Sequence, residues 1–180
     1  MSAASLSMYQ KWQQAVEETL KRVIIQYYQN PPSLRSASLI LQLVDRYWGH
    51  MNRNLFDSPV HYYTVLAKTT DHLLRFLNPA VDLNLSPFLL FERIEYGTKR
   101  TKTYVDIDVA YHHHEFCTIR KFVWQEDESF YLHYTRSAVN ACEGRFGIRL
   151  KKIEFCSLLT GERKIQYVDA HGRLQPIMAK

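Results

Sequence analysis

The sequence predicts an α+β fold, with a single antiparallel sheet and helices packed on one of its faces. Two patterns lead to this class. Apolar residues recur at helical spacing between residues 36 and 76, whereas from residue 88 apolar and polar residues alternate as they do in paired strands. Hydrophobic residues make up 46% of the 180 residues, with only 6 Gly and 6 Pro, which is typical of a packed globular chain. Helices followed by antiparallel strands indicate the α+β class.

The chain is expected to contain a terminal arm over residues 1–18 and one domain over residues 19–180. The arm is rich in Ser, Ala and Gln, and its large apolar residues Met8, Trp12 and Val16 are four positions apart. That spacing is helical, but the segment is short and terminal, so either a short helix or a disordered arm is expected. The rest of the chain is long enough to bury one core.

The first half is predicted to begin with a strand and continue with two helices. Residues 23–28 are β-prone and stand before Asn-Pro-Pro, which a helix does not continue through, so a strand is expected. Residues 36–50 have apolar residues at i, i+3 and i+4 after a capping serine, and predict a helix. A second helix is predicted over 59–76, with Pro59 in its first turn. Residues 77–87 contain two prolines and predict a surface loop.

The second half is predicted to consist mainly of strands. Residues 88–96 and 102–111 flank the turn GTKRT and predict a hairpin. A third strand is expected over 115–124, and a helix over 134–145. Two further strands are expected over 147–159 and 165–170, which leaves residues 171–180 as a tail.

Cysteine usage and the N-terminal segment bear on location. The three cysteines, at 117, 142 and 156, are odd in number and lack C-x-x-C spacing, which argues against a disulfide framework and a zinc site built from thiolates. A reducing compartment is expected. No window approaches the roughly 20 apolar residues of a spanning helix, and the N-terminus lacks a signal-peptide core. The chain is therefore expected to be soluble or to attach to membranes from outside.

The search for catalytic groups yields weak candidates. His112 and His114 share a strand face and could hold a metal, although histidines at a hairpin tip are also commonly solvated. Asp106 and Asp108 also share a face and, with His114, would suit a metal-dependent nuclease; solvated carboxylates on a hairpin are the alternative. Cys142 lies within a predicted helix, where a small buried residue is the ordinary explanation. We therefore predict no enzyme, no metal site and no cofactor.

Charge points to anionic partners. The chain has 23 Lys and Arg against 18 Asp and Glu, a net charge of +5, and residues 140–180 hold eight basic against four acidic residues. Basic loop tips at one edge of the sheet would suit binding to anionic lipid or to a ribonucleoprotein. The alternative is that these basic side chains are scattered over the surface and only solvated. The residues predicted to contact membrane or ribonucleoprotein are Lys99, Arg100, Lys102, Arg149, Lys151, Lys152, Arg163 and Lys164.

The order of elements resembles the central part of rhabdovirus matrix proteins. The resemblance runs through Arg35-Ser36 after a predicted strand, a helix ending in Gly49-His50-Met51, a polar loop with Pro59, and the segment Tyr63-Thr64-Val65-Leu66-Ala67. The segments TYVDIDVAY, FGIRLKKIEF and IQYVD continue it, so that it covers roughly residues 20–169. Lys11 is the one basic residue of residues 1–18, and NPPSL lacks the Tyr of a Pro-Pro-x-Tyr motif, which favours a plant cytorhabdovirus-like relative.

The resemblance implies a non-enzymatic viral structural protein. Such a protein self-associates, binds anionic membrane peripherally and condenses the viral nucleocapsid and its RNA during virion assembly and budding. It would be found in the virion, in host cytoplasm and at the cytoplasmic face of host membranes. Met8, Tyr9 and Trp12 are the residues expected to dock on a neighbouring copy. The alternative from the same charge and from 12 Tyr is a single-domain RNA-binding regulatory protein.

Overall fold

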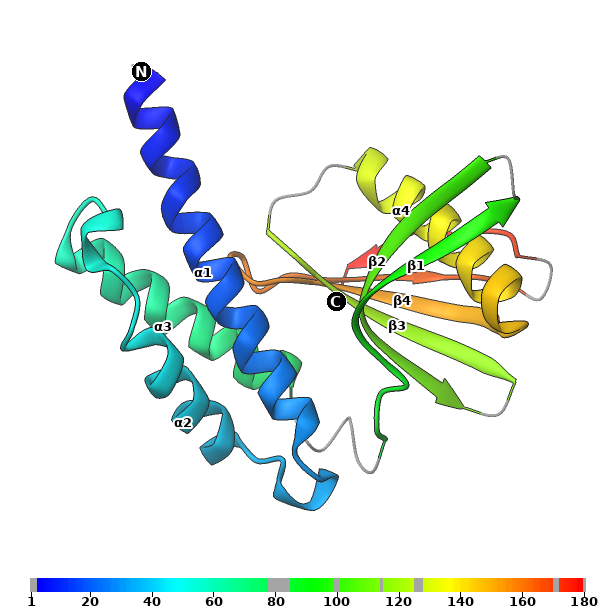
Figure 1. Ribbon diagram of the computed structural model, residues 1–180, viewed down its shortest axis with the longest axis horizontal. Helices are drawn as coiled ribbons and strands as arrows, with labels where there is room; N and C mark the ends of the chain where they lie inside the picture. The colour runs from blue at the N-terminus through cyan, green and yellow to red at the C-terminus, as the bar shows by residue number, and fades with distance from the viewer. Residues whose placement is uncertain are drawn as a thin grey trace. The chain divides into compact units, whose positions relative to one another are not determined.

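The protein has the α+β architecture that its sequence predicts (Figure 1). The structure, a computed structural model, describes residues 3–77, 85–98, 101–113, 115–124, 128–169 and 172–179, with side chains from Lys11 onward. The chain divides into two compact units, a helical unit over Met1–Asn84 and a sheet unit over Leu85–Lys180. This division differs from the expected arm over 1–18 and single domain over 19–180.

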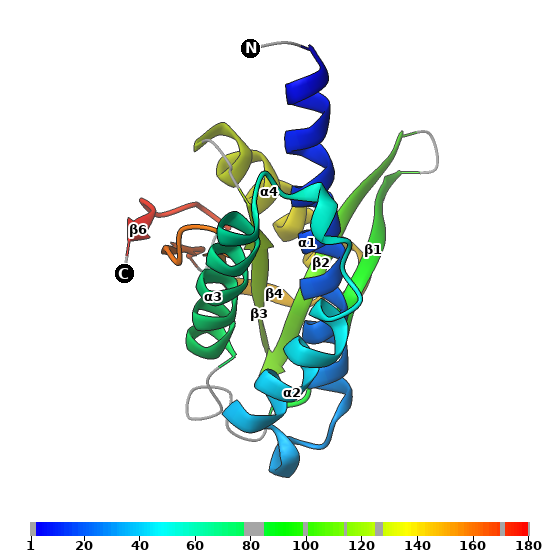
Figure 2. The ribbon, with the colours of Figure 1, turned by 90° about the vertical axis from the view of Figure 1, so that its left-hand side faces the viewer.

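The helical unit consists of three helices and two short 3₁₀ turns. Helix α1 spans Ala3–Gln29, α2 spans Ala37–Trp48 and α3 spans Pro59–Phe76; the 3₁₀ turns are Pro32–Leu34 and Arg53–Leu55. Helix α1 packs against α2, and α2 against α3 (Figure 2). The predicted helices over 36–50 and 59–76 are thereby confirmed.

Helix α1 overturns two expectations about the first 30 residues. It runs unbroken through residue 18, where the arm was expected to end, and through residues 23–28, where a strand was expected. Its buried side chains recur with helical spacing, at Val16, Leu20, Val23, Ile24 and Tyr27. Burial of this stripe outweighs the local β-propensity of a Val-Ile-Ile-Gln-Tyr-Tyr segment, because that propensity is a weak preference that packing overrides.

Local polar contacts set the helix boundaries in this unit. The Oγ atoms of Ser36 and Ser58 accept hydrogen bonds from the amides three residues on, at 3.1 Å each, and so cap α2 and α3. At the end of α1, the buried Arg35 side chain donates to the carbonyl oxygens of Tyr28 (2.8 Å) and Asn30 (3.0 Å). These carbonyls would otherwise lack a partner at the helix terminus.

The sheet unit is a six-stranded sheet whose spatial order follows the chain. Its elements are β1 (Leu89–Thr98), β2 (Thr101–His113), β3 (Phe116–Val123), helix α4 (Glu128–Ala141), a π-helical turn (Cys142–Phe146), β4 (Arg149–Ser157), β5 (Arg163–Tyr167) and the two-residue β6 (Met178–Ala179). All neighbouring strands are antiparallel except β3 and β4, which are parallel. The sheet is therefore mixed, and not wholly antiparallel as predicted, because α4 is a crossover that returns the chain to the same end.

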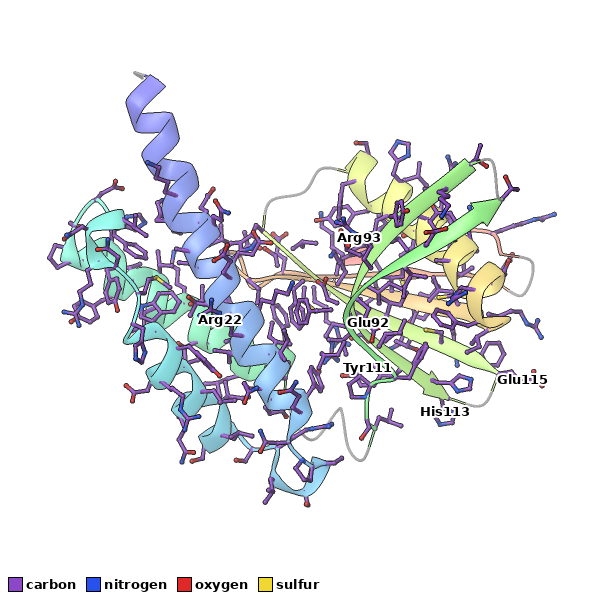
Figure 3. The ribbon with its side chains drawn as sticks, in the orientation of Figure 1. Arg22, Glu92, Arg93, Tyr111, His113 and Glu115 are labelled. Carbon is purple, nitrogen blue, oxygen red and sulfur yellow. The ribbon has the colours of Figure 1, made fainter. Side chains whose placement is uncertain are left out.

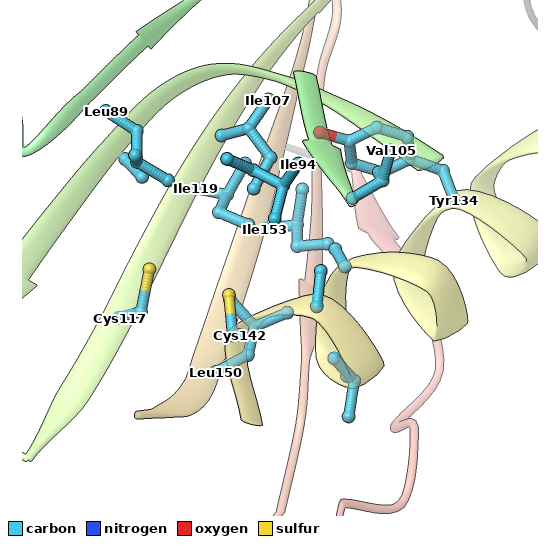
Figure 4. Close-up of a cluster of buried hydrophobic side chains, with 14 of the residues drawn as sticks. Leu89, Ile94, Val105, Ile107, Cys117, Ile119, Tyr134, Cys142, Leu150 and Ile153 are labelled. Atoms are coloured by element: carbon cyan, nitrogen blue, oxygen red, sulfur yellow. The ribbon is translucent and has the colours of Figure 1, made fainter. Parts of the chain in front are cut away.

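Helix α4 covers one face of this sheet and forms the core of the unit with it (Figure 4). Tyr131 of α4 packs edge-on against Phe155 of β4, with ring centroids 4.7 Å apart. Cys117 and Cys142 lie beside each other in this core, among Ile107, Ile119, Leu150 and Ile153. The helix begins six residues before the predicted start at 134, since Glu128 opens it and acidic residues favour a helix N-terminus.

The predicted hairpin and the strands over 115–124, 147–159 and 165–170 are confirmed. The expected tail is part of the sheet unit instead: Leu174 forms a β-bridge with Val168, and Met178 of β6 lies opposite Ile165 of β5. Part of this segment is therefore ordered by backbone hydrogen bonds. The composition of residues 171–180 did not indicate such bonds. The loop predicted over 77–87 lies mostly outside the described residues.

Candidate basic–aromatic interaction surface

An exposed aromatic ring marks the end of the sheet where β2 turns into β3. Phe116 is the first residue of β3 and lies opposite His113 of β2 and Arg149 of β4. Its side chain is 38% exposed, which is uncommon for Phe in a folded unit. Figure 3 shows His113 and Glu115 at this end of the hairpin. The ring is thus presented at an edge that other molecules can reach.

Two cationic side chains lie close to the Phe116 ring. The guanidinium carbon of Arg149 and the Nζ of Lys151 each lie 5.7 Å from the ring centroid, within the range of cation–π contacts. Arg149 lies directly opposite Phe116, and β4 carries one extra residue just after it: Cys117 pairs with Leu150, and Thr118 with Lys152. A bulge of this kind redirects a side chain. We call Phe116, Arg149 and Lys151 the Phe116 platform.

The platform keeps a net positive charge. Glu115 lies 3.8 Å from Arg149, but both side chains are exposed, so the attraction between them is weak. Lys151 has no acidic partner within ion-pair distance among the residues the structure describes. An exposed apolar ring with two cations close to it is a combination that suits both the headgroup region of an anionic membrane and a stacked nucleobase.

Further along the same strands, three cations converge on one carboxylate. Glu154 of β4 is 3% exposed and pairs with Lys152 (2.6 Å), Arg163 (2.7 Å) and Arg120 (3.2 Å). Burial by itself raises the pKa of Glu154, but the charges of Arg120, Lys152 and Arg163 outweigh it and lower the pKa to about 2. We call these four residues the Glu154 cluster; its formal charge is positive.

The eight predicted contact residues therefore do not form one surface. Arg149 and Lys151 belong to the Phe116 platform, and Lys152 and Arg163 to the Glu154 cluster. The remaining described ones serve other contacts: Lys102 pairs with Glu95 at 2.9 Å, and the Nζ of Lys164 lies 4.7 Å from the Tyr131 ring centroid. Lys99 and Arg100 lie outside the described residues.

The sequence patterns did not point to three residues of these two surfaces, namely Phe116, Arg120 and Glu154. Nothing in EFCTIRKFVW marks Phe116 as exposed, since an apolar residue in a strand is usually buried. The signal for the Glu154 cluster was a Glu within the basic, strand-forming segment RLKKIEF, opposite an Arg in the previous strand. Pairing those two strands in parallel register was needed to recognise it.

The residues predicted to mediate self-association lie in α1. Trp12 is 4% exposed and packs in the helical unit, with its ring centroid 5.8 Å from that of Phe56 and 5.0 Å from that of His61. Met8 and Tyr9 are helical, but their side chains lie outside the description. Trp12 is thus a core residue of its unit, and docking through residues 8–12 stays a prediction.

The two aspartates of the alternative metal site are engaged in other contacts. Asp106 is exposed and pairs with Arg93 at 2.7 Å. Asp108 is buried, where a solvated face was expected, and accepts from Lys121 (2.7 Å) and the Phe122 amide (2.8 Å). His114 lies outside the described residues, and within those described no three His, Cys, Asp or Glu side chains are grouped to hold a metal ion.

The three cysteines are buried free thiols. A hydrogen bond with Cys142, together with burial, raises the pKa of Cys117. Cys142 is thus a buried core residue, as its small size and its position within a predicted helix indicated.

No protein-family model matches the chain, and no curated protein matches it significantly. Across the described parts of the chain, no helix has both the length and the hydropathy that crossing a bilayer requires.

Proposed function

We propose that this protein is a viral matrix protein of the rhabdovirus type: a structural adaptor that self-associates, binds anionic membrane peripherally and condenses the viral ribonucleoprotein. The Phe116 platform is the observation that carries the proposal. It combines an exposed ring with Arg149 and Lys151, both of which had been predicted to contact an anionic surface. The sequence motifs from Arg35-Ser36 to IQYVD that resemble rhabdovirus matrix proteins supply the class of protein; the segment before Arg35 is helical and not the strand that the resemblance assumed.

The chemistry of the platform suits peripheral attachment. Each Lys or Arg near an anionic membrane surface contributes about 1 kcal/mol, and an aromatic ring adds apolar contact in the headgroup region. One platform therefore binds weakly. Many copies joined to one another would bind a surface far more tightly than one, since each attached copy raises the effective concentration of the next.

Vesicle flotation tests the membrane part of the proposal. The full chain is expected to float with phosphatidylserine-containing vesicles at low salt, and not with neutral phosphatidylcholine vesicles. The double variant Arg149→Gln/Lys151→Gln should bind roughly 30-fold more weakly, since it loses about 2 kcal/mol of electrostatic attraction. Binding by the double variant equal to that of the wild type would remove the platform from the proposal.

Arg22→Gln/Arg46→Gln is the matched control, because it removes two exposed positive charges from the helical unit and leaves the platform intact. Its flotation should equal that of the wild type. If the wild-type chain binds no anionic vesicles and stays monomeric throughout a concentration series, the proposal fails as a whole.

A second candidate is a basic single-domain RNA-binding regulatory protein. The same exposed ring with two cations close to it favours this function, because nucleobases stack on aromatic side chains while cations contact the phosphates. This function predicts tight, salt-sensitive RNA binding by a chain that remains monomeric. An RNA titration combined with light scattering separates it from the matrix function, in which self-association accompanies binding.

A further inference from the structure

Two of the three buried thiols of the sheet unit are in direct contact. Cys117 of β3 and Cys142, the first residue of the π-helical turn, are each 0% exposed and belong to the same core cluster. Their side chains are hydrogen-bonded to each other, and Figure 4 shows them side by side. Two cysteines that are distant in the sequence therefore meet at one point of this core.

The backbone independently brings these two positions together. Cys117 lies opposite Leu150 in the parallel pair formed by β3 and β4. The chain enters β4 directly from the π-helical turn, where the Ile148 amide donates to the Cys142 carbonyl at 3.2 Å. Cys142 is therefore held close to the start of β4, next to the strand position that faces Cys117.

The contact makes the two thiols chemically unequal. The hydrogen bond from Cys117 lowers the pKa of Cys142 and outweighs burial, which acts in the opposite direction. The same hydrogen bond, together with burial, raises the pKa of Cys117. The thiolate is the nucleophilic form of cysteine. Cys142 is therefore the thiol that ionises first, and Cys117 is the one that stays protonated beside it.

The π-helical turn that carries Cys142 is built to open locally. Glu143, Gly144 and Arg145 are exposed, and a Cβ added at Gly144 or Gly147 would meet none of the described atoms within 4 Å. Glycine is the least favourable residue for a helix apart from proline, and Gly147 has a φ of 66°. Turns of this type are short and often occur at functional sites. Opening of this helix end would expose Cys142 to a small reagent while the sheet stays folded.

We propose that Cys117 and Cys142 form a peroxide-sensitive thiol pair that closes to an intramolecular disulfide. The Cys142 thiolate attacks one oxygen of hydrogen peroxide, the O–O bond breaks, and the leaving hydroxide takes up the proton that Cys142 lost and becomes water. The Cys117 sulfur then attacks the sulfur of the Cys142 sulfenic acid. The S–O bond breaks, and the hydroxyl group leaves as a second water with the Cys117 proton. The two thiols lose two electrons in all, and the peroxide gains them.

The disulfide would join the two chain segments that carry the Phe116 platform. Cys117 directly follows Phe116, and the turn that begins at Cys142 leads into β4 at Arg149. Closing the loop over residues 118–141 restricts the unfolded chain and so stabilises the fold. Oxidation should raise the melting temperature of the sheet unit by roughly 10 °C and slow amide exchange at the start of β4. This inference goes beyond the proposed function and does not depend on it.

Cys156 provides an internal control for burial. It is 1% exposed, so it is shielded almost as completely as the thiol pair. It lies opposite Phe122, however, and the five residue steps from 117 to 122 along β3 correspond to roughly 16 Å. A disulfide requires Cα atoms less than about 7 Å apart, so Cys156 cannot join Cys117 within the folded chain. Peroxide should therefore consume two of the three thiols.

Thiol counting on the full chain tests the proposal. The reduced, folded chain is treated with a small molar excess of hydrogen peroxide, and the remaining thiols are then alkylated in denaturant and located by peptide mass mapping. Untreated chain should carry an alkyl group on each of its three cysteines. Treated chain should carry one, on Cys156, and should yield two peptides joined through Cys117 and Cys142. Dithiothreitol should restore all three thiols and reverse the rise in melting temperature.

Two variants separate the thiol pair from the third cysteine. Cys156→Ala is the matched control, because it removes one buried thiol and leaves the pair intact; peroxide should still join Cys117 to Cys142 and raise its melting temperature. Cys142→Ala removes one member of the pair. It should keep both remaining thiols under the same treatment, with an unchanged melting temperature, and circular dichroism checks that both variants fold.

Three results would overturn the proposal: a folded wild type that keeps all three thiols in peroxide, a disulfide that involves Cys156, or equal loss of thiols in the Cys142→Ala variant. The mapping of the wild type decides the matter even if a variant folds poorly. Vesicle flotation of the reduced chain reports on the proposed function separately, so failure of the thiol pair leaves that function untouched, and the reverse also holds.

Discussion

At the scale of single residues, Glu154 balances three positive charges in the sheet unit. Three cations from β3, β4 and β5 converge on this carboxylate. Removing one member of a buried ion cluster is costly because it leaves the others without compensation. Glu154 therefore stabilises the sheet. Its negative charge also offsets the repulsion between Lys152 and Arg163, which both pair with it.

The charge of Glu154 should make stability depend on pH. Its pKa in the folded chain is about 2, below the ordinary value of 4.5. A lowered pKa stabilises the fold above pH 4.5, and this stabilisation is lost as the pH falls toward 2. Glu154→Gln should lower the free energy of unfolding by about 3 kcal/mol at pH 7. At pH 3 the difference from the wild type should fall to less than half of that value.

Urea denaturation at pH 7 and pH 3 measures both numbers. Glu162→Gln is the matched control, because Glu162 is an exposed carboxylate close to β5, and its substitution should change stability by less than about 0.5 kcal/mol. A Glu154→Gln difference that is the same at both pH values would contradict the assigned cause.

At the scale of elements, boundaries that depend on local chemistry are the ones the sequence predicts well. Ser36 and Ser58 both stand immediately before an apolar helical pattern, and both cap a helix. The identity of an element is harder to predict when its residues favour one structure and its surroundings another. Residues 23–28 have strand propensity but lie in α1, because Val16 and Leu20 before them continue the same buried stripe.

The cap of α2 provides a test at this scale. Ser36→Ala removes the hydrogen bond from the Leu39 amide and should lower the free energy of unfolding of the helical unit by about 1 kcal/mol. Ser38→Ala, two residues further on at an exposed helical position, should be neutral or slightly stabilising because Ala is the better helix former. Thermal unfolding followed by circular dichroism compares the two. Equal effects would show that the cap contributes nothing specific.

At the scale of the whole molecule, a net charge of +5 is moderate, so its distribution matters more than its size. Arg149 and Lys151 are concentrated around an exposed ring, whereas Lys102 and Lys164 are engaged elsewhere. The apolar and the electrostatic parts of the platform should therefore respond differently to salt.

Phe116→Ser should weaken attachment to phosphatidylserine vesicles at both low and high salt, by roughly tenfold, because contact of the ring with the headgroup region is not screened. The Arg149→Gln/Lys151→Gln variant should differ from the wild type at low salt and converge with it at high salt. Co-sedimentation with vesicles at two ionic strengths measures this. If the Phe116→Ser variant binds vesicles as tightly as the wild type does, the ring contributes nothing and attachment depends on charge alone.

The sequence by itself determined the α+β class, the two capped helices, the β1–β2 hairpin and the basic character of the second half. These follow from periodicity, capping serines and composition, which act over a few neighbouring residues. The tertiary structure decided the helical identity of residues 23–28, the parallel pairing of β3 with β4, and the burial of Trp12 and Asp108. It also placed Lys151 beside Phe116. Each of these depends on which distant residues pack or pair together, and no local pattern encodes that.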